Sequence, residues 1–390
     1  MHGPRSKSVV ALGSLALLLV VALTVLHACF VANGLVAPEK AVVEEIDAAP
    51  RDPCAHARIP AQPLPQSANV QDAAVFALSA VEFGGGRAGG ASEVGYDLDN
   101  ICSCFQDDAG NPPVAESCTP RARTTQHCDG VGGRDNALAE TVNQIPTGPV
   151  GFGTYITRIL REGRGGLLMV LDGYNGEPND DKVSLGFLPS HGKYRVVDGG
   201  PDADAQPEYV DADTTNRWSI APDSYLLRNN SGTPARLARG WVRDGTLVVL
   251  LPSTGLPLVG LQLSMEDAYL VAPLNLDDKT KPLIDRGTIV GRWGLKNLIE
   301  SAGRFTVSLT AQGPAQLCTQ GSFFDPTFKN AICQTADINL FADADGKGKP
   351  CDAVSIAIGF RTENAEVGDF VDVPTVAECP DGSVELTCPQ

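Results

Sequence analysis

Eleven cysteines are distributed unevenly along this chain. Cys29 stands near the start, and the other ten form an early and a late group of five each, with no cysteine in residues 129–317. Because five is an odd number, complete pairing of the ten requires at least one disulfide between the two groups. Such a bridge holds both ends of the mature chain together and, in the chain-entropy model, stabilises the fold by about 4–5 kcal/mol. The ten are Cys54, Cys102, Cys104, Cys118 and Cys128 in the early group and Cys318, Cys333, Cys351, Cys379 and Cys388 in the late group.

The spacing of these cysteines leaves their individual pairing open. Cys102 and Cys104 are too close in sequence to bridge one another comfortably, so we expect each to take a distant partner. A zinc site formed by the early group with His127 is the alternative, because the ligand types fit. The spacing matches no paired-ligand zinc motif, which favours disulfides formed in an oxidising compartment.

The N-terminus indicates where those disulfides form. Arg5 and Lys7 precede an apolar run from Val9 to Leu26, the layout of a secretory signal or a membrane anchor. The basic residues stay on the cytoplasmic side of a membrane, so we expect the rest of the chain outside the cytoplasm. Residues 1–28 are therefore assigned to a signal peptide or membrane anchor.

Three fates of this segment are open. Leu26-His27-Ala28-Cys29 resembles a bacterial lipobox, in which cleavage before the cysteine leaves a lipid on Cys29, although His27 departs from the pattern. An uncleaved run of about 18 apolar residues can just span a bilayer, and cleavage further along would release a secreted protein. If Cys29 is lipidated, Phe30 after it resembles the sorting pattern for the outer membrane.

The exported part of the chain is strongly acidic. Arg5 and Lys7 are the only charged residues in positions 1–28, so the remainder carries 28 basic and 47 acidic residues, a net charge of −19. A surface of this charge repels nucleic acid and anionic membrane surfaces. It suits a solvated extracellular surface that binds divalent cations.

The rest of the chain divides by composition into three parts. Residues 29–66 are rich in proline and alanine and are expected to tether the globular part to the membrane. Residues 67–285 are expected to form a β-sandwich-like domain with cysteine-rich early loops. Residues 286–390 are expected to form a cysteine-rich C-terminal part that packs on the same domain.

The pattern of short apolar runs predicts the fold class. Runs at 167–174, 182–188, 194–197, 217–221, 235–242, 246–252, 258–264 and 267–276 are separated by turn residues, and Arg243-Asp244-Gly245 is a hairpin signal. Residues 70–84 are ambiguous between strand and helix, and short helices are expected from Asp135 or Asn136 to Ile145, at 155–162 and at 294–302. We therefore expect a mainly β fold, an antiparallel sandwich or jelly roll with a few short helices and disulfide-tied loops.

Clusters of aspartate are the candidate ligand sites. Asp97 and Asp99 lie within the early cysteine group with Asp129 and Asp135 nearby, and Asp343, Asp345 and Asp352 lie near Cys351. Calcium needs six to eight hard oxygen ligands, which alternating aspartates supply. Aligned with a helix–loop–helix calcium loop, the second cluster has Phe341 where the first aspartate belongs, so that motif is broken. The alternative is a set of solvated turns in which aspartate binds its own backbone.

Signatures of catalysis are missing from the sequence. It holds no Gly-x-Ser-x-Gly elbow and no His-Glu-x-x-His motif. Carboxylate pairs for glycoside hydrolysis depend on a separation that sequence does not give. A binding or surface-structural role without enzymatic activity is the leading hypothesis. A polysaccharide hydrolase or a glycan-binding protein is the alternative.

Four segments carry a resemblance to a class of proteins. They are residues 95–104 (GYDLDNICSC), 128–137 (CDGVGGRDNA), 173–180 (GYNGEPND) and 351–360 (CDAVSIAIGF). With them, the chain resembles acidic, cysteine-rich bacterial cell-envelope lipoproteins of uncharacterised function. The resemblance implies a location in the bacterial envelope, and we expect attachment to the membrane through the N-terminal lipid or anchor. Whether an envelope protein or a glycan is the partner is left open. The resemblance implies no activity.

Overall fold

The computed structural model describes residues 56–65, 70–84, 93–104, 116–120, 127–142, 151–197, 206–209, 215–220, 237–253, 255–278, 281–310, 313–319, 324–371, 379 and 387–388. The predicted signal or anchor, its lipidation at Cys29, and Cys54 lie outside these residues. No helix within the described residues has the length and apolar character needed to cross a bilayer.

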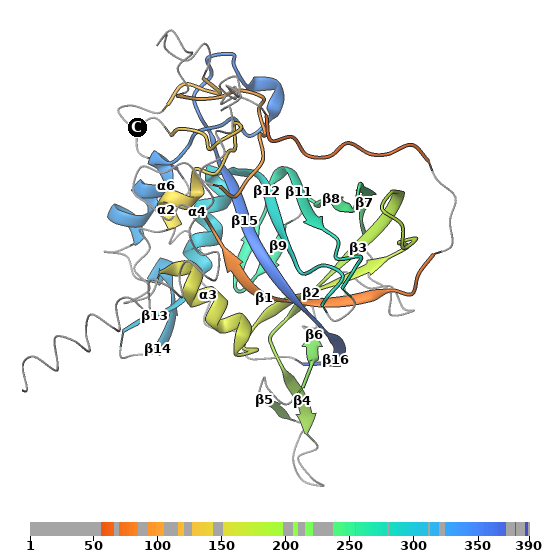
Figure 1. Ribbon diagram of the computed structural model, residues 1–390. Helices are drawn as coiled ribbons and strands as arrows, with labels where there is room; N and C mark the ends of the chain where they lie inside the picture. Colours follow the sequence, from red (N-terminus) through yellow and green to blue (C-terminus); the bar gives the residue numbers. More distant parts are fainter. Residues whose placement is uncertain are drawn as a thin grey trace, which may run out of the picture. The chain divides into compact units, whose positions relative to one another are not determined.

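Eight antiparallel strands form a closed barrel (Figure 1). Each strand pairs with the next barrel strand along the chain, so the topology is a simple meander. Strand β1 closes the barrel because Ala74–Ala77 pair with β2 while Phe76–Glu82 pair with β15. The barrel strands are β1 (Ala74–Glu82), β2 (Gly166–Asp172), β3 (Asp180–Ser190), β7 (Leu237–Arg243), β8 (Thr246–Leu250), β11 (Glu266–Pro273), β12 (Arg286–Gly294) and β15 (Ala353–Asn364).

The mainly β prediction is confirmed, but the main sheet is a closed barrel instead of the predicted sandwich or jelly roll. The difference depends on the pairing of β1 with β15, whose residues stand far apart in sequence. Local alternation of apolar residues identifies strands but does not report which strands meet. Closure removes the exposed sheet edges that a sandwich would leave.

The two ends of the barrel differ. Because neighbouring strands are antiparallel, successive connections alternate between the ends. The β2–β3, β7–β8 and β11–β12 connections form what we call the turn end, and the longer connections form the loop end. The longer connections hold α2 (Leu138–Val142), α3 (Phe152–Arg161), α4 (Leu295–Arg304), α6 (Asn330–Gln334), η3 (Leu317–Thr319), η4 (Phe324–Lys329), η5 (Ala342–Ala344), β4 (Tyr194–Val197), β5 (Gln206–Tyr209), β6 (Arg217–Ile220), β9 (Leu256–Leu258), β10 (Leu261–Leu263), β13 (Thr306–Thr310) and β14 (Gly313–Gln316), and β16 (Glu366–Phe370) follows β15.

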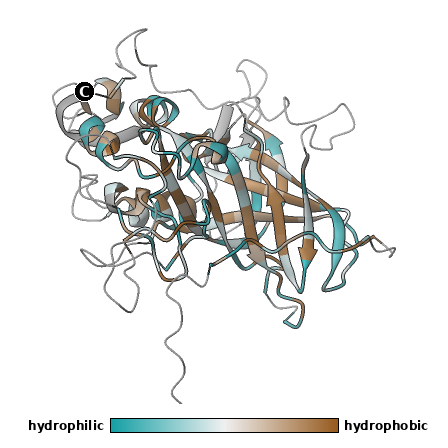
Figure 2. Cartoon of the chain, turned by 90° about the horizontal axis from the view of Figure 1, so that it is seen from above, coloured by the Kyte–Doolittle hydropathy of each residue, from teal (hydrophilic) through white to brown (hydrophobic). Residues whose placement is uncertain are grey.

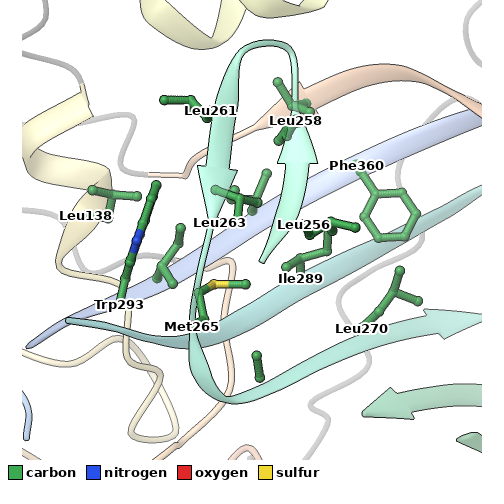
Figure 3. Close-up of a cluster of buried hydrophobic side chains, with 14 of the residues drawn as sticks. Leu138, Leu256, Leu258, Leu261, Leu263, Met265, Leu270, Ile289, Trp293 and Phe360 are labelled. Atoms are coloured by element: carbon green, nitrogen blue, oxygen red, sulfur yellow. The ribbon is translucent and has the colours of Figure 1, made fainter. Parts of the chain in front are cut away.

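The core fills the barrel and continues into its loop end. Apolar residues concentrate on the barrel strands (Figure 2). The β9–β10 hairpin adds four buried leucines, which pair across the two short strands and therefore share one face of the hairpin. Figure 3 shows these leucines beside Leu270, Ile289, Trp293 and Phe360, which come from barrel strands.

Several predicted elements are confirmed in outline. The Arg243-Asp244-Gly245 signal is the β7–β8 turn, where Asp244 and Gly245 have φ of 50° and 75° as a type I′ turn requires. The ambiguous segment 70–84 contains strand β1, and the helices expected at 155–162 and 294–302 are α3 and α4. The run 258–264 is half of a hairpin that turns at Val259 and Gly260. Strand β12 was not predicted, and the proposed boundary at 285/286 falls inside the barrel.

Part of the predicted tether lies on the barrel. Trp241 Nε1 donates a hydrogen bond of 3.0 Å to the carbonyl of Pro60, and Gln62 Nε2 donates one of 2.7 Å to the carbonyl of Asp181. At the other end of this segment, the amide of Ala57 donates to the carbonyl of Gly132 over 2.7 Å. Residues 56–65 thus run from the loop end towards the turn end before β1 begins, as the red-orange trace in Figure 1 shows.

Four disulfides join described residues: Cys104–Cys128, Cys118–Cys351, Cys318–Cys379 and Cys333–Cys388. Cys118–Cys351 links the early group to the late group, which confirms the prediction made from their odd numbers. The zinc alternative is wrong, because Cys104, Cys118 and Cys128 form disulfides and have no thiolate to bind a metal.

Candidate metal centre

Three carboxylates converge in the long β1–β2 connection at the loop end. One oxygen from each of Asp97, Asp99 and Asp135 lies within 4.8 Å of the others. An isolated antiparallel bridge between Tyr96 and Asp135 brings the two loop segments together, with the Asp135 amide 3.1 Å from the Tyr96 carbonyl. We call Asp97, Asp99 and Asp135 the carboxylate centre.

Backbone hydrogen bonds fix the three carboxylates. Asp97 Oδ1 accepts from the amide of Asn100 at 2.7 Å, and Asp99 Oδ1 accepts from the amide of Ile101 at 2.8 Å. Asp135 Oδ2 accepts from the amide of Leu98 at 2.6 Å. The short polar side chains of Asp and Asn favour such local turns, which here hold the carboxylates in one place.

Two further side chains border the centre. His56 Nδ1 lies against Asp97 Oδ2, and Ser117 Oγ donates a hydrogen bond to Asp99 Oδ2. The amide of Asp97 also donates to the carbonyl of Ala57 at 3.1 Å. The segment that leads into the barrel therefore closes one side of the centre.

The carboxyl groups are electrostatically unfavourable when all are ionised. Burial raises the pKa of Asp99 to about 6. The hydrogen bond from Ser117 lowers this pKa, and the nearby charges of Asp97 and Asp345 raise it further. Burial raises the pKa of the neighbouring Asp129 to about 8, and that of Asp135 well above its ordinary value, with added repulsion from other carboxylates. A bound cation would relieve both the desolvation and the repulsion.

A buried arginine joins this centre to the barrel. Arg292 stands two residues before the end of β12 and is fully buried. Its Nη2 donates to the carbonyl of Leu98 at 2.7 Å, and its Nη1 donates to the carbonyl of Asn339 at 2.8 Å. The same Nη2 lies 2.7 Å from Asp345 Oδ2. Arg292 thus holds the loop between Asp97 and Asp99 against the barrel wall.

The five aspartates expected to bind calcium do not form one site. Asp97 and Asp99 belong to the carboxylate centre, and Asp345 lies next to it on Arg292. Asp343 and Asp352 are exposed, and Asp352 Oδ1 accepts the amide of Leu340 at 2.7 Å.

Other residues of this region gave weaker signals in the sequence. Asp129 and Asp135 were noted only as neighbours of Asp97 in sequence. No sequence signal pointed to the partly buried Asp337, whose Oδ1 accepts the Ser355 amide at 2.8 Å. The sequence did contain a signal for Arg292, because it is a charged residue inside an apolar run. A charged residue buried in such a run needs a partner.

A small polar cavity lies beside the centre and shares Ser117 with it. Its volume is about 20 Å³, and its walls are Ser103, Glu116, Ser117, Cys118, Pro120, His127, Ala336, Asp337 and Cys351. A cavity of this size holds water but not a sugar ring. Comparison of the chain with protein-family models, with curated proteins and with solved structures found no match.

Proposed function

We propose that this protein is a non-enzymatic, extracytoplasmic protein of the bacterial cell envelope whose loop end is stabilised by calcium bound at Asp97, Asp99 and Asp135. Its role is binding or surface structure. The observation that carries the proposal is the convergence of the three carboxylates within 4.8 Å. Buried carboxylates at this separation repel one another, and a bound cation turns that repulsion into attraction.

The donor atoms favour calcium among the common cations. The three residues of the centre offer carboxylate oxygens. Calcium takes six to eight oxygen ligands in flexible geometry. Magnesium demands a near-octahedral arrangement and keeps several waters, which suits this buried centre less well. Zinc prefers nitrogen and sulfur ligands, whereas the three converging residues offer carboxylate oxygens with His56 Nδ1 against one of them.

Burial of the centre supports ion binding over hydrolysis. A polysaccharide hydrolase needs two carboxylates that reach a sugar from either side of an open cleft. Here Asp97 and Asp135 are buried and accept backbone hydrogen bonds, and the adjoining cavity is about 20 Å³ in volume. These features favour a structural cation.

Three features support an extracytoplasmic location. Four disulfides favour an oxidising compartment. The basic and apolar N-terminus has the layout of an export signal. The lipobox-like sequence ending at Cys29 favours attachment to the membrane by lipid, with Phe30 favouring the outer membrane.

Calcium titration tests the proposal. The full-length protein is stripped with EDTA, and calcium binding is measured by calorimetry alongside the melting temperature. Wild type and Asp277→Asn, a control at the exposed turn end, should bind about one calcium ion per chain and melt at higher temperature with calcium. Asp99→Asn and Asp135→Asn should lose most of that binding. Failure of wild type to bind calcium overturns the proposal.

A further inference from the structure

Asp345 has a feature that the carboxylate centre does not explain. Its side chain is 6% exposed, and its Oδ2 lies 2.7 Å from Arg292 Nη2. Both of its carboxylate oxygens are buried and accept no hydrogen bond among the described residues, and Oδ1 also has no ion-pair partner there. A buried carboxylate oxygen without a partner has lost its hydration with nothing in exchange and therefore calls for a ligand.

Two contacts hold Asp345 beside the carboxylate centre. Arg292 Nη2 lies 2.7 Å from both the Asp345 carboxylate and the carbonyl of Leu98, and Leu98 stands between Asp97 and Asp99. The amide of Gly346, the next residue, donates to the carbonyl of Ser117 at 2.8 Å. Ser117 in turn donates its hydroxyl to Asp99. Asp345 is thus placed beside the centre from two sides.

We propose that Asp345 is a fourth carboxylate ligand of the calcium centre, bound to the cation through Oδ1 while Oδ2 stays on Arg292. This inference rests on the function proposed above. Asp345 is outside the group of oxygens within 4.8 Å, so ligation requires its Oδ1 to approach the three carboxylates when the cation binds. Arg292 then acts as a positioning residue, because it touches Asp345 and not the cation.

Charge and ligand number both support a fourth carboxylate. Three aspartates supply at most six oxygens, and each already accepts a backbone hydrogen bond. Calcium needs six to eight, so a further oxygen donor is required. Asp345 brings one more negative charge, while calcium and the buried Arg292 guanidinium together bring three positive charges against these four carboxylates and Asp267, whose Oδ2 lies 3.6 Å from Arg292 Nε. The cation and Arg292 thus offset most of the negative charge that gathers here, as buried charges require.

This arrangement predicts what calcium does to the fold. Asp97 and Asp99 come from one loop, Asp135 from another, and Asp345 from the β12–β15 connection. A cation bound to all four aspartates would link these three segments. Arg292, which contacts Asp345, would connect the linked segments to strand β12 of the barrel wall. Calcium should therefore order the segment around Asp345 as well as the two loops of the carboxylate centre.

Asp345→Asn tests the inference against Asp343→Asn, an exposed neighbour in the same turn. Calcium affinity is measured by calorimetry on the EDTA-treated full-length proteins. The inference expects Asp343→Asn to match wild type and Asp345→Asn to bind calcium about 10–100-fold more weakly. Equal affinity of Asp345→Asn and wild type overturns the inference and leaves the proposed function standing. Absence of binding to wild type overturns both.

Hydrogen exchange of wild type keeps the test decisive if Asp345→Asn does not fold. Added calcium should slow exchange of backbone amides in residues 340–346 as well as in 97–101 and 130–136. Protection confined to the last two segments contradicts the inference. A purely structural role for Asp345 would lower the melting temperature of Asp345→Asn equally with EDTA and with calcium. Ligation instead reduces the increment that calcium adds.

Discussion

Arg292 Nη2 donates a hydrogen bond of 2.7 Å to the carbonyl of Leu98, and this bond joins the barrel wall to the acidic loop. The arginine is fully buried, and its other partners are Asn339, Asp345 and Asp267, whose Oδ2 lies 3.6 Å from Arg292 Nε. A charged side chain persists in such a place only when it is paired and hydrogen-bonded. The loop that carries Asp97 and Asp99 is therefore positioned by the barrel as well as by its own turns.

Replacing Arg292 should destabilise the fold strongly. Arg292→Met leaves the carbonyls of Leu98 and Asn339 without their donor and the buried Asp345 without its counter-charge. Loss of one partner of a buried ion pair costs about 3–5 kcal/mol. Denaturant unfolding of the full-length protein measures it. Arg286→Met, exposed in the same strand, should change stability by less than about 0.5 kcal/mol. Similar stabilities of the two variants would show that the Arg292 contacts contribute little.

Without calcium, the protein should become less stable as the pH rises. The pKa of Asp99 is raised to about 6 and that of Asp129 to about 8, above their values in an unfolded chain. Groups with raised pKa values stabilise the fold fully below about pH 4 and lose that contribution as the pH passes through the folded values. Melting temperatures in EDTA should therefore fall between pH 5 and pH 8.5.

Asp129→Asn tests the part of the decrease in melting temperature that occurs towards pH 8. Removing this carboxyl should flatten the decrease around pH 8, while Asp277→Asn keeps the wild-type profile. Saturating calcium should also flatten the wild-type profile, because the cation binds the ionised form of the centre. A melting temperature in EDTA that rises over this range would contradict the pKa shifts.

Gly133 should be sensitive to substitution because of where it stands. It has φ of 65°, and an added Cβ would lie 3.2 Å from Asp97 Oδ2 and 3.1 Å from Cys102 Sγ. Gly348 is a matched control, since its φ is 67° and an added Cβ would meet nothing within 4 Å. Both alanine variants pay about 1 kcal/mol for the left-handed backbone. Only Gly133→Ala should also weaken calcium binding in calorimetry. Equal calcium affinities would show that Gly133 has no role in shaping the centre.

All ten cysteines after Cys29 should be in disulfides. Four bridges account for eight of them, which leaves Cys54 and Cys102 for a fifth bridge by elimination. The contact between Ala57 and Gly132 places the chain after Cys54 beside Gly133, which adjoins Cys102. Alkylation without reductant should modify none of the ten, and a non-reduced digest should yield the Cys54–Cys102 peptide. Alkylation of either residue before reduction would contradict this pairing.

Sequence patterns predicted the strands with local signals and failed where long-range contacts decide. The β7–β8 turn was predictable because Asp244 and Gly245 accept positive φ. Strand β12 was missed because Gly287, Gly291 and Arg292 interrupt its apolar pattern. The two glycines are there because an added Cβ would lie 2.5 Å from Phe360 at Gly287 and 2.8 Å from Ala268 at Gly291. Those contacts become visible only in the folded chain.

The sequence predicted a cluster of aspartates that binds calcium, but it did not predict which aspartates form the cluster. Asp97 and Asp99 were identifiable because alternating aspartates suit calcium. Asp135 joins them through the bridge between its amide and the Tyr96 carbonyl, a contact between two irregular loops. Asp343 resembled the others in sequence yet is exposed on the surface. Irregular loops have no periodicity, so their aspartates could not be sorted into ligands and surface residues by pattern.

Metal content of the native protein tests the central claim most directly. The native protein is isolated without chelator, and bound metals are quantified by mass spectrometry beside the Asp99→Asn and Asp277→Asn variants. We expect about one calcium ion per chain in wild type and Asp277→Asn, and a large loss in Asp99→Asn. Absence of calcium from the wild-type protein, or equal calcium in all three, would contradict a calcium centre at Asp97, Asp99 and Asp135.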